Sequence, residues 1–253
     1  MMLTDTHCHI HEAGYPLDVG DVMSRAHSMG VGKMICVGTD NTTSDEAVNF
    51  ARNHENVWAS VGAHPHDAKD GFERVVELLR LRDEHSSIVA VGEIGLDYFY
   101  THSPREVQIA AFEAQLQMAY EAKLPVIFHV REAFDDFWPI FSNFRGLRGV
   151  LHSFTDNTSN LERGLSEGLY IGLNGISTFT KDENQQKIFD SIPETHMLFE
   201  TDAPFLTPSP HRGKVNEPAF VRYVAEHHAS RRGVELEHLA RVTSANASTL
   251  FGV

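Results

Sequence analysis

Short apolar runs alternate with longer amphipathic segments along the whole chain. The apolar runs have the length of buried strands, and the amphipathic segments have the period of helices that cover a sheet. The pattern predicts eight strands, at Leu3–Thr6, Lys33–Val37, Val57–Val61, Ile88–Gly92, Val126–Phe128, Gly149–Leu151, Leu169–Leu173 and Met197–Phe199.

The segments between these runs predict helices. The clearest begins at Pro104, because proline suits the first turn of a helix and the apolar residues that follow form one stripe. The predicted helices are Asp18–Ser28, Asp45–His54, Phe72–Glu84, Pro104–Ala122, Asn160–Ser166, Glu183–Asp190, Pro218–Ser230 and Leu236–Leu250.

Strands that alternate with helices indicate an α/β fold with a parallel sheet, and eight such units favour a TIM (β/α)8 barrel. The length of 253 residues is typical of one such barrel, at about 250 residues, so we expect a single domain over residues 1–253. The alternative is an open, doubly wound sheet, which is attractive when a nucleotide-binding fingerprint is present. The sequence contains neither GxGxxG nor GxxxxGK[ST].

Side chains of the metal-ligand type follow the predicted strands at the point where each one ends. They are His7 and His9, His64, Glu93, His129, His152 and Asp202. The carboxyl ends of the strands carry the functional residues in a TIM barrel, so we expect a metal site there. His7 and His9 are two residues apart on one strand and therefore point to the same face.

Each of these residues alone is compatible with a polar cap on a strand, but their recurrence at strand after strand favours metal binding. The set exceeds what one tetrahedral ion needs, and a carboxylate such as Glu93 can bridge two cations, so we expect two divalent ions. The mixed imidazole and carboxylate set suits Zn or Mn, and also Fe or Ni, while Mg can enter a carboxylate-rich half of the site. The identity of the metal stays open.

Composition narrows the possible partners and the compartment. With 21 basic and 35 acidic residues the net charge is -14, so a polyanionic substrate must be held locally rather than by long-range attraction. Cys8 and Cys36 form no disulfide framework, and no export signal or membrane span is recognisable, which predicts a cytoplasmic protein. Nothing in the sequence indicates a stable protein partner.

Several ordered motifs together resemble the TatD family of metal-dependent deoxyribonucleases, over nearly the whole chain. The motifs are His7-Cys8-His9, Gly62-Ala63-His64-Pro65, Gly92-Glu93-Ile94-Gly95-Leu96-Asp97-Tyr98, Pro125-Val126-Ile127-Phe128-His129-Val130-Arg131, Leu151-His152-Ser153-Phe154, Glu200-Thr201-Asp202-Ala203-Pro204-Phe205-Leu206 and Arg212-Gly213-Lys214-Val215-Asn216-Glu217-Pro218. The resemblance implies an amidohydrolase-like barrel with two metal ions. It also implies trimming of single-stranded or frayed DNA from a 3′ end, in DNA repair or degradation.

The resemblance also implies the roles of individual residues. His7, His9 and Asp202 bind one ion, His129 and His152 bind the other, and Glu93 is shared. Asp202 and Glu93 are the candidate catalytic residues, with Asp202 as the proton acceptor or as the group that orients the attacking water. The candidate substrate contacts are His64, Arg131, Tyr98, His211 and Arg212, and Phe99 and Tyr100 are further candidates for stacking on bases.

Two other classes of function stay open. The same scaffold and metal pair can hydrolyse small-molecule esters, lactones, amides or organophosphates, or the ester of an aminoacyl-tRNA. A catalytically silent metal-binding protein is the third possibility, but it would be expected to lack ligands, and none is missing from the set.

Overall fold

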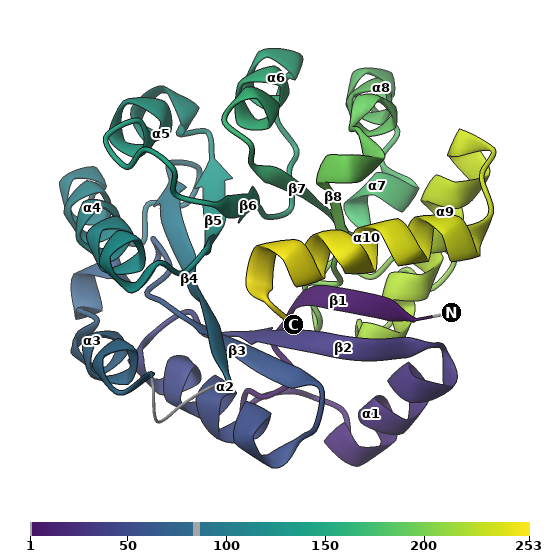
Figure 1. Cartoon of the computed structure of the whole chain (residues 1–253), viewed down its shortest axis with the longest axis horizontal. Helices are drawn as coiled ribbons and strands as arrows, with labels where there is room; N and C mark the ends of the chain where they lie inside the picture. The colour runs from purple at the N-terminus through teal and green to yellow at the C-terminus, as the bar shows by residue number, and fades with distance from the viewer. Residues whose placement is uncertain (1, 83–86) are drawn as a thin grey trace. The chain divides into compact units, whose positions relative to one another are not determined.

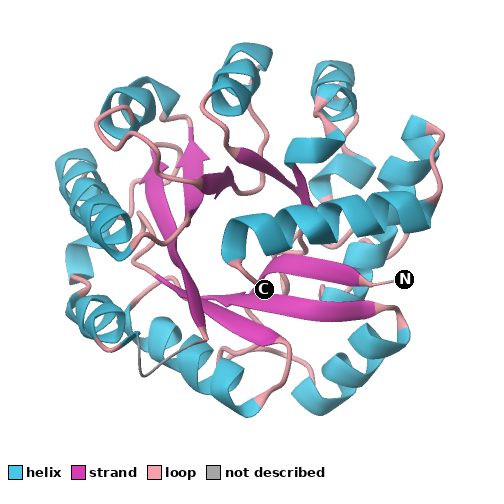
Figure 2. Cartoon of the chain, viewed as in Figure 1, coloured by secondary structure: helices cyan, strands magenta, loops and turns pink. Residues whose placement is uncertain are grey.

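The computed structural model describes residues 2–82 and 87–253, and within them eight strands alternate with helices (Figures 1 and 2). The strand order runs from β1 to β8 in sequence order, which is the order of a TIM (β/α)8 barrel, so the predicted fold class is confirmed. The strands are β1 Leu3–Cys8, β2 Val31–Val37, β3 Val57–Val61, β4 Ile88–Asp97, β5 Val126–Arg131, β6 Gly149–Leu151, β7 Tyr170–Leu173 and β8 Met197–Phe199. Each corresponds to a predicted strand.

The helices agree with the predictions except at a few positions. They are α1 Val19–Ser28, α2 Asn41–Asn53, α3 Glu73–Arg80, α4 Arg105–Ala122, α5 Phe134–Phe141, α6 Thr158–Ser166, α7 Ile176–Phe179, α8 Glu183–Ser191, α9 Val221–Arg232 and α10 Leu236–Phe251, with 3-10 turns at Ala68–Asp70, Glu194–His196 and Pro218–Phe220. Of the helix predicted over Phe72–Glu84, residues 83 and 84 lie outside the described residues.

Three differences from the predicted helices have clear physical causes. Helix α2 begins at Asn41, before the predicted start at Asp45, because Asp40 and Thr43 form a reciprocal capping box. Helix α5 was not predicted, since it has only eight residues and contains Pro139, which is unusual inside a helix. The four-residue helix α7 is too short to produce a recognisable period.

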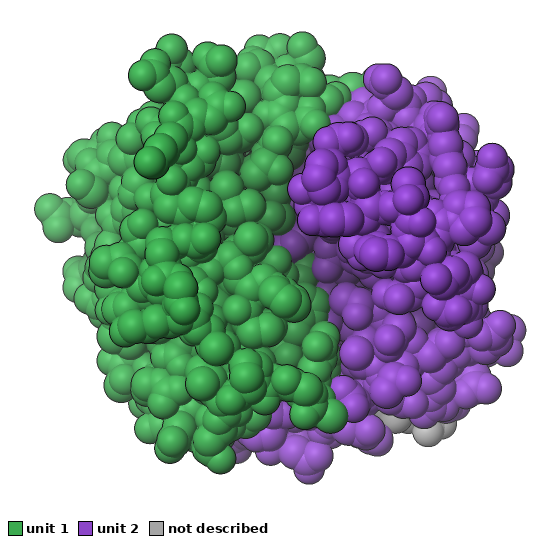
Figure 3. Space-filling model, turned by 180° about the vertical axis from the view of Figure 1, so that it is seen from behind, with its two compact units in different colours: residues 1–35, 153–253 green, residues 36–152 purple. Residues whose placement is uncertain are grey.

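The chain divides into two compact units, which Figure 3 colours separately. Unit 1 comprises residues 1–35 and 153–253, and unit 2 comprises residues 36–152. The prediction of a single domain over residues 1–253 stays a prediction.

Unit 1 contains β1, β7 and β8. Strands β7 and β8 pair in parallel, and beyond the end of β8 the chain continues beside β1 through a parallel bridge between Cys8 and Ala203. Every residue of β1 is buried, and helix α10 packs on it (Figure 1).

Unit 2 contains β3 to β6, which pair in parallel one after another. Helix α2 packs on β3 and helix α4 on β4 (Figure 1). Gly95 of β4 lies opposite His129 of β5 with a φ of 151°, and a Cβ atom there would collide with the carbonyl oxygen of His129. Glycine at this position therefore allows β4 to approach the strand that carries His129.

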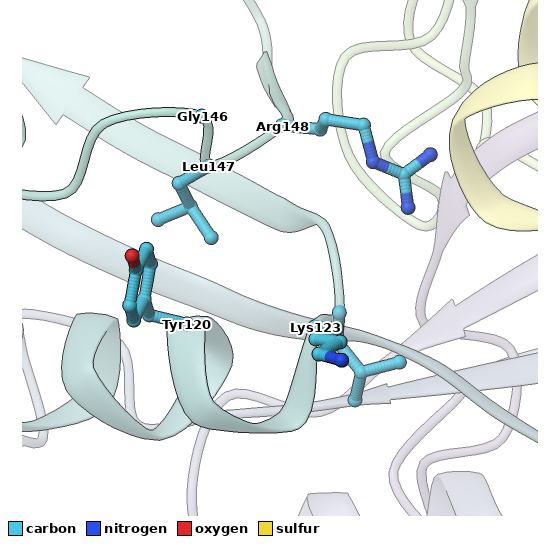
Figure 4. A pocket seen from close by; sticks show the side chains of 6 residues that line it. Tyr120, Lys123, Gly146, Leu147 and Arg148 are labelled. Carbon is cyan, nitrogen blue, oxygen red and sulfur yellow. The ribbon is translucent and has the colours of Figure 1, made fainter.

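A cavity of about 380 Å³ lies at the amino-terminal ends of β5 and β6 (Figure 4). Its lining comes from the residues before these strands, namely Tyr120, Lys123, Leu124, Gly146, Leu147 and Arg148. The predicted site residues are not among them. No helix within residues 2–82 and 87–253 combines the length and hydrophobicity that crossing a bilayer requires.

Candidate metal centre

The first cluster of metal-ligand side chains lies in unit 1 and consists of His7, His9 and Asp202. The Nε2 atoms of His7 and His9 are 3.1 Å apart. Asp202 Oδ1 lies 3.6 Å from Nε2 of His7 and 3.3 Å from Nε2 of His9. Two imidazole nitrogens and one carboxylate oxygen thus face a common point.

Backbone hydrogen bonds bring these three residues together. The Asp202 N–H donates to the carbonyl oxygen of His7 at 2.8 Å, and the His9 N–H donates to that of Ala203 at 2.8 Å. Asp202 has a φ of 59°, a left-handed conformation that aspartate tolerates better than most residues. The turn at Asp202 directs its side chain toward the two histidines.

A buried carboxylate, Asp5, holds the backbone segments that carry His7 and Asp202 together. It accepts hydrogen bonds from the Thr201 N–H at 2.9 Å, the Thr201 hydroxyl at 2.6 Å and the His7 N–H at 3.3 Å. Burial raises the pKa of Asp5 to about 7, although these hydrogen bonds oppose the rise. Asp5 therefore ties β1 to the chain just after β8 through backbone and hydroxyl groups.

The second cluster lies in unit 2 around Glu93 Oε1. His129 Nδ1 is 2.8 Å from this oxygen, His64 Nε2 is 3.7 Å from it and His152 Nε2 is 3.8 Å from it. His64, Glu93 and His129 form a group whose ligand atoms lie within 4.8 Å of one another. The structure thus gathers the predicted ligands of this unit and adds His64 to them.

A second carboxylate, Asp97, completes the network of unit 2. His129 Nε2 lies 2.9 Å from Asp97 Oδ2, and His66 Nε2 lies 3.0 Å from the same oxygen. Burial alone would lower the pKa of His129, but the hydrogen bonds with Asp97 and Glu93 outweigh it and raise the pKa to about 8. Burial alone would raise the pKa of Asp97. Hydrogen bonds, of which the one from His129 has the largest effect, outweigh burial and lower this pKa below its usual value. Burial, with the nearby His129, lowers the pKa of His64.

Both clusters fit a divalent ion by the chemistry and spacing of their donors. A tetrahedral ion with ligands at about 2.0 to 2.1 Å keeps neighbouring ligand atoms roughly 3.3 Å apart. The separations of 3.1, 3.3 and 3.6 Å in unit 1 match that spacing. In unit 2, a histidine with one nitrogen toward the cluster and the other on a carboxylate is the usual arrangement of a metal-bound imidazole.

Comparison with known proteins assigns the family. The model of the TatD related DNases matches residues 4–252. The chain belongs to the TatD family.

Individual relatives agree with this assignment. The uncharacterized metal-dependent hydrolase YabD of Bacillus subtilis is 35% identical, with all of both chains covered. The 3'-5' ssDNA/RNA exonuclease TatD of Erwinia amylovora is 37% identical, with 93% of this chain and 94% of the relative covered. The crystal structure of the TatD homolog YJJV of Escherichia coli has a TM-score of 0.91 at 29% identity, with 99% of this chain and 98% of the other covered. The chain is therefore a metal-dependent hydrolase of the TatD family.

The predicted substrate contacts of this TatD-family chain lie in different surroundings. Arg131 is exposed, and its guanidinium lies 4.1 Å from the ring centre of Phe99 and 4.9 Å from that of Tyr100. Tyr98 is half-buried and donates its hydroxyl to Asp136 at 2.5 Å. Its neighbours on the chain are thus better exposed for contact with a ligand than Tyr98 itself.

His211 and Arg212 pack on aromatic rings of unit 1. The His211 ring stacks on Phe220 with ring centres 4.5 Å apart. Arg212 lies 3.7 Å from the centre of the Phe179 ring and donates to the carbonyl oxygen of Thr207 at 2.6 Å. Their role as substrate contacts stays a prediction.

Asp5, His66 and Asp97 belong to these networks. The sequence predicted no role for Asp5 and Asp97, whereas it offers His66 as a candidate that is less well placed than His64. Asp97 lies beyond the predicted end of β4 at Gly92, whereas the strand continues to Asp97. Asp5 is a fully buried acid between Thr4 and Thr6, and its burial became apparent only in the structure, where it has the partners that a buried carboxylate needs. His66 follows His64 at a spacing of two, the same spacing that singled out His7 and His9.

Proposed function

We propose that this TatD-family hydrolase is a metal-dependent deoxyribonuclease that removes nucleotides from the 3′ end of single-stranded or frayed DNA. The observation that carries the proposal is the gathering of imidazole and carboxylate groups into a cluster in each unit. The relative from Erwinia amylovora, which bears the name of a 3'-5' ssDNA/RNA exonuclease, supports the choice of substrate and polarity.

The residues proposed to hold the metal fall into two sets. In unit 1 the set is His7, His9 and Asp202, and in unit 2 it is Glu93, His129 and His152, with His64 beside them. Bound divalent ions would lower the pKa of water and stabilise negative charge on a phosphate. That Glu93 is shared between the two ions stays a prediction, as does the choice among Mg, Mn and Zn.

Asp202 is proposed to accept the proton of the attacking water. Its Oδ1 atom faces the two histidines, and its side chain retains some exposure, at 15%. Glu93 is nearly buried beside three imidazoles, so its carboxylate is better placed to hold positive groups than to exchange protons with solvent.

The charge of the chain favours a strand end over the middle of a duplex. With a net charge of -14, few basic groups can displace counterions along a long stretch of DNA. A single-stranded end needs only local contacts. The cytoplasmic location and the role in DNA repair or degradation stay predictions.

Timed digestion of 5′-labelled and 3′-labelled single strands tests the proposal, with duplex, circular DNA and small esters as comparison substrates. We expect stepwise loss from the 3′ end, abolished by a chelator and restored by added metal, with about two equivalents of metal bound per chain. Turnover of esters without cleavage of any strand would contradict the proposal and favour a small-molecule hydrolase.

A further inference from the structure

Two exposed aromatic rings follow β4 in unit 2, where metal-ligand side chains gather. Phe99 and Tyr100 are 50% and 43% exposed, and their ring centres lie 4.7 Å apart. Neighbouring exposed apolar side chains can mark a binding site. We call Phe99, Tyr100 and the Arg131 guanidinium that contacts both rings the aromatic platform.

Arg131 covers one side of the platform. Its guanidinium carbon is 4.1 Å from the centre of the Phe99 ring, which is the distance of a cation–π contact. Half of Phe99 stays exposed beside Arg131 and Tyr100, so part of its ring is accessible to a planar ligand. Arg131 is itself exposed, so it also places a positive charge beside that ligand.

Asp97 joins the platform to the candidate metal cluster. Its Oδ1 atom accepts hydrogen bonds from the Phe99 N–H at 3.0 Å and the Tyr100 N–H at 2.9 Å. Its Oδ2 atom lies 2.9 Å from His129 Nε2. One buried carboxylate thus holds both the platform and a proposed metal ligand, so their separation is set by rigid contacts rather than by a free loop.

The two strands that carry these groups are also registered with one another. Asp97 of β4 lies opposite Arg131 of β5, and the Tyr98 N–H donates to the carbonyl oxygen of Arg131 at 3.0 Å. The Tyr98 hydroxyl donates a hydrogen bond to Asp136, which fixes the chain just before Phe99. The platform is therefore a preformed feature of the fold.

We propose that the aromatic platform is a nucleotide subsite, where Phe99 stacks on an unpaired base next to the phosphate at the metal cluster of unit 2. This inference rests on the proposed function and names what its substrate must present, which is a base free to expose its face. Stacking tolerates every base, because each has a π-face, so the subsite selects single strands without selecting sequence. A cation beside the ring suits the phosphate that each nucleotide carries.

The test compares a single-stranded oligonucleotide with the same strand carrying abasic residues at its last two 3′ positions. The variants are Phe99→Ala and Phe99→Trp. Tyr120→Ala is the matched control, since Tyr120 is equally exposed, at 50%, but lies at the other end of β5 (Figure 4). The measurements are kcat/KM with metal and binding by fluorescence anisotropy in chelator.

We expect the wild type to prefer the normal strand over the abasic strand about 10-fold in both measurements. Phe99→Ala should remove this preference by weakening only the normal strand, whereas Phe99→Trp and Tyr120→Ala should keep it. Equal values for the two strands in the wild type overturn the subsite, as does an equal loss on both strands in Phe99→Ala.

These outcomes separate the subsite from the proposed function. Cleavage without a preference for bases keeps the nuclease and removes the subsite. A preference for bases in binding without cleavage keeps the subsite and removes the nuclease. If Tyr120→Ala loses the preference while Phe99→Ala keeps it, base binding belongs to the other end of β5 and the inference is overturned.

Discussion

The candidate clusters of the two units use the same kinds of ligand but are held in place differently. In unit 1 the three ligand atoms lie 3.1 to 3.6 Å apart, and hydrogen bonds of the backbone and of Asp5 position the residues. In unit 2 the imidazole of His129 is held directly by two carboxylates, Glu93 and Asp97. In unit 1, hydrogen bonds to the backbone position the ligand residues. In unit 2, hydrogen bonds between carboxylates and an imidazole ring orient the ligand itself.

The largest effect is expected from Asp202→Asn in unit 1. The amide keeps an oxygen for the metal but cannot accept a proton, so we expect some metal to be retained and turnover to fall roughly 10²- to 10⁴-fold. Steady-state nuclease rates together with metal content measure both effects.

Asp190→Asn is the matched control, because Asp190 pairs with Arg231 on the surface. It should leave both rate and metal content unchanged. Near-normal turnover in Asp202→Asn would remove the proton-accepting role from the cluster of unit 1.

Asp97→Asn tests the support of the cluster in unit 2. The amide weakens the hold on His129 without removing a proposed ligand, so we expect the metal affinity of this cluster to fall roughly 10- to 100-fold. The affinity of the cluster in unit 1 should not change. Titration with metal against a chelator of known affinity resolves the two sites.

The control for Asp97→Asn is Asp136→Asn, since Asp136 contacts Tyr98 and Arg105 in the same region. An equal loss of affinity in both variants would mean that the effect comes from disturbed folding after β4 and not from the orientation of His129.

The contrast between the clusters also explains what could be predicted from sequence. Glu93, His129 and His152 stand out in the sequence because each directly follows an apolar run, and the carboxyl ends of parallel strands gather residues that are far apart in the chain. Most of the strands were predictable because their buried residues are apolar, and β1, with its buried Thr4, Asp5 and Thr6, is the exception.

The supporting residues were harder to predict, because their roles depend on three-dimensional contacts. Asp97 is the last residue of β4, which is longer than predicted. Its partners His66 and His129 come from other parts of the chain. The hydroxyl of Tyr98 has a partner in Asp136, 38 residues further along the chain, and the predicted contact of Tyr98 with substrate stays a prediction. No local pattern reveals such a pairing.

Asp5→Asn is expected to have the smallest effect on the clusters, and it tests the comparison most directly. Asp5 contacts Thr201 and the backbone of His7 but no imidazole. The amide keeps an oxygen for the two N–H donors and removes a charge that burial disfavours, but it replaces the acceptor of the Thr201 hydroxyl. The free energy of unfolding should therefore change by no more than about 1 to 2 kcal/mol, while metal affinity stays at the wild-type value. Denaturant unfolding of the metal-free protein and the same chelator titration measure the two quantities. A 10-fold loss of affinity would show that backbone support orients ligands as strongly as Asp97 does, and the distinction between the two clusters would fail.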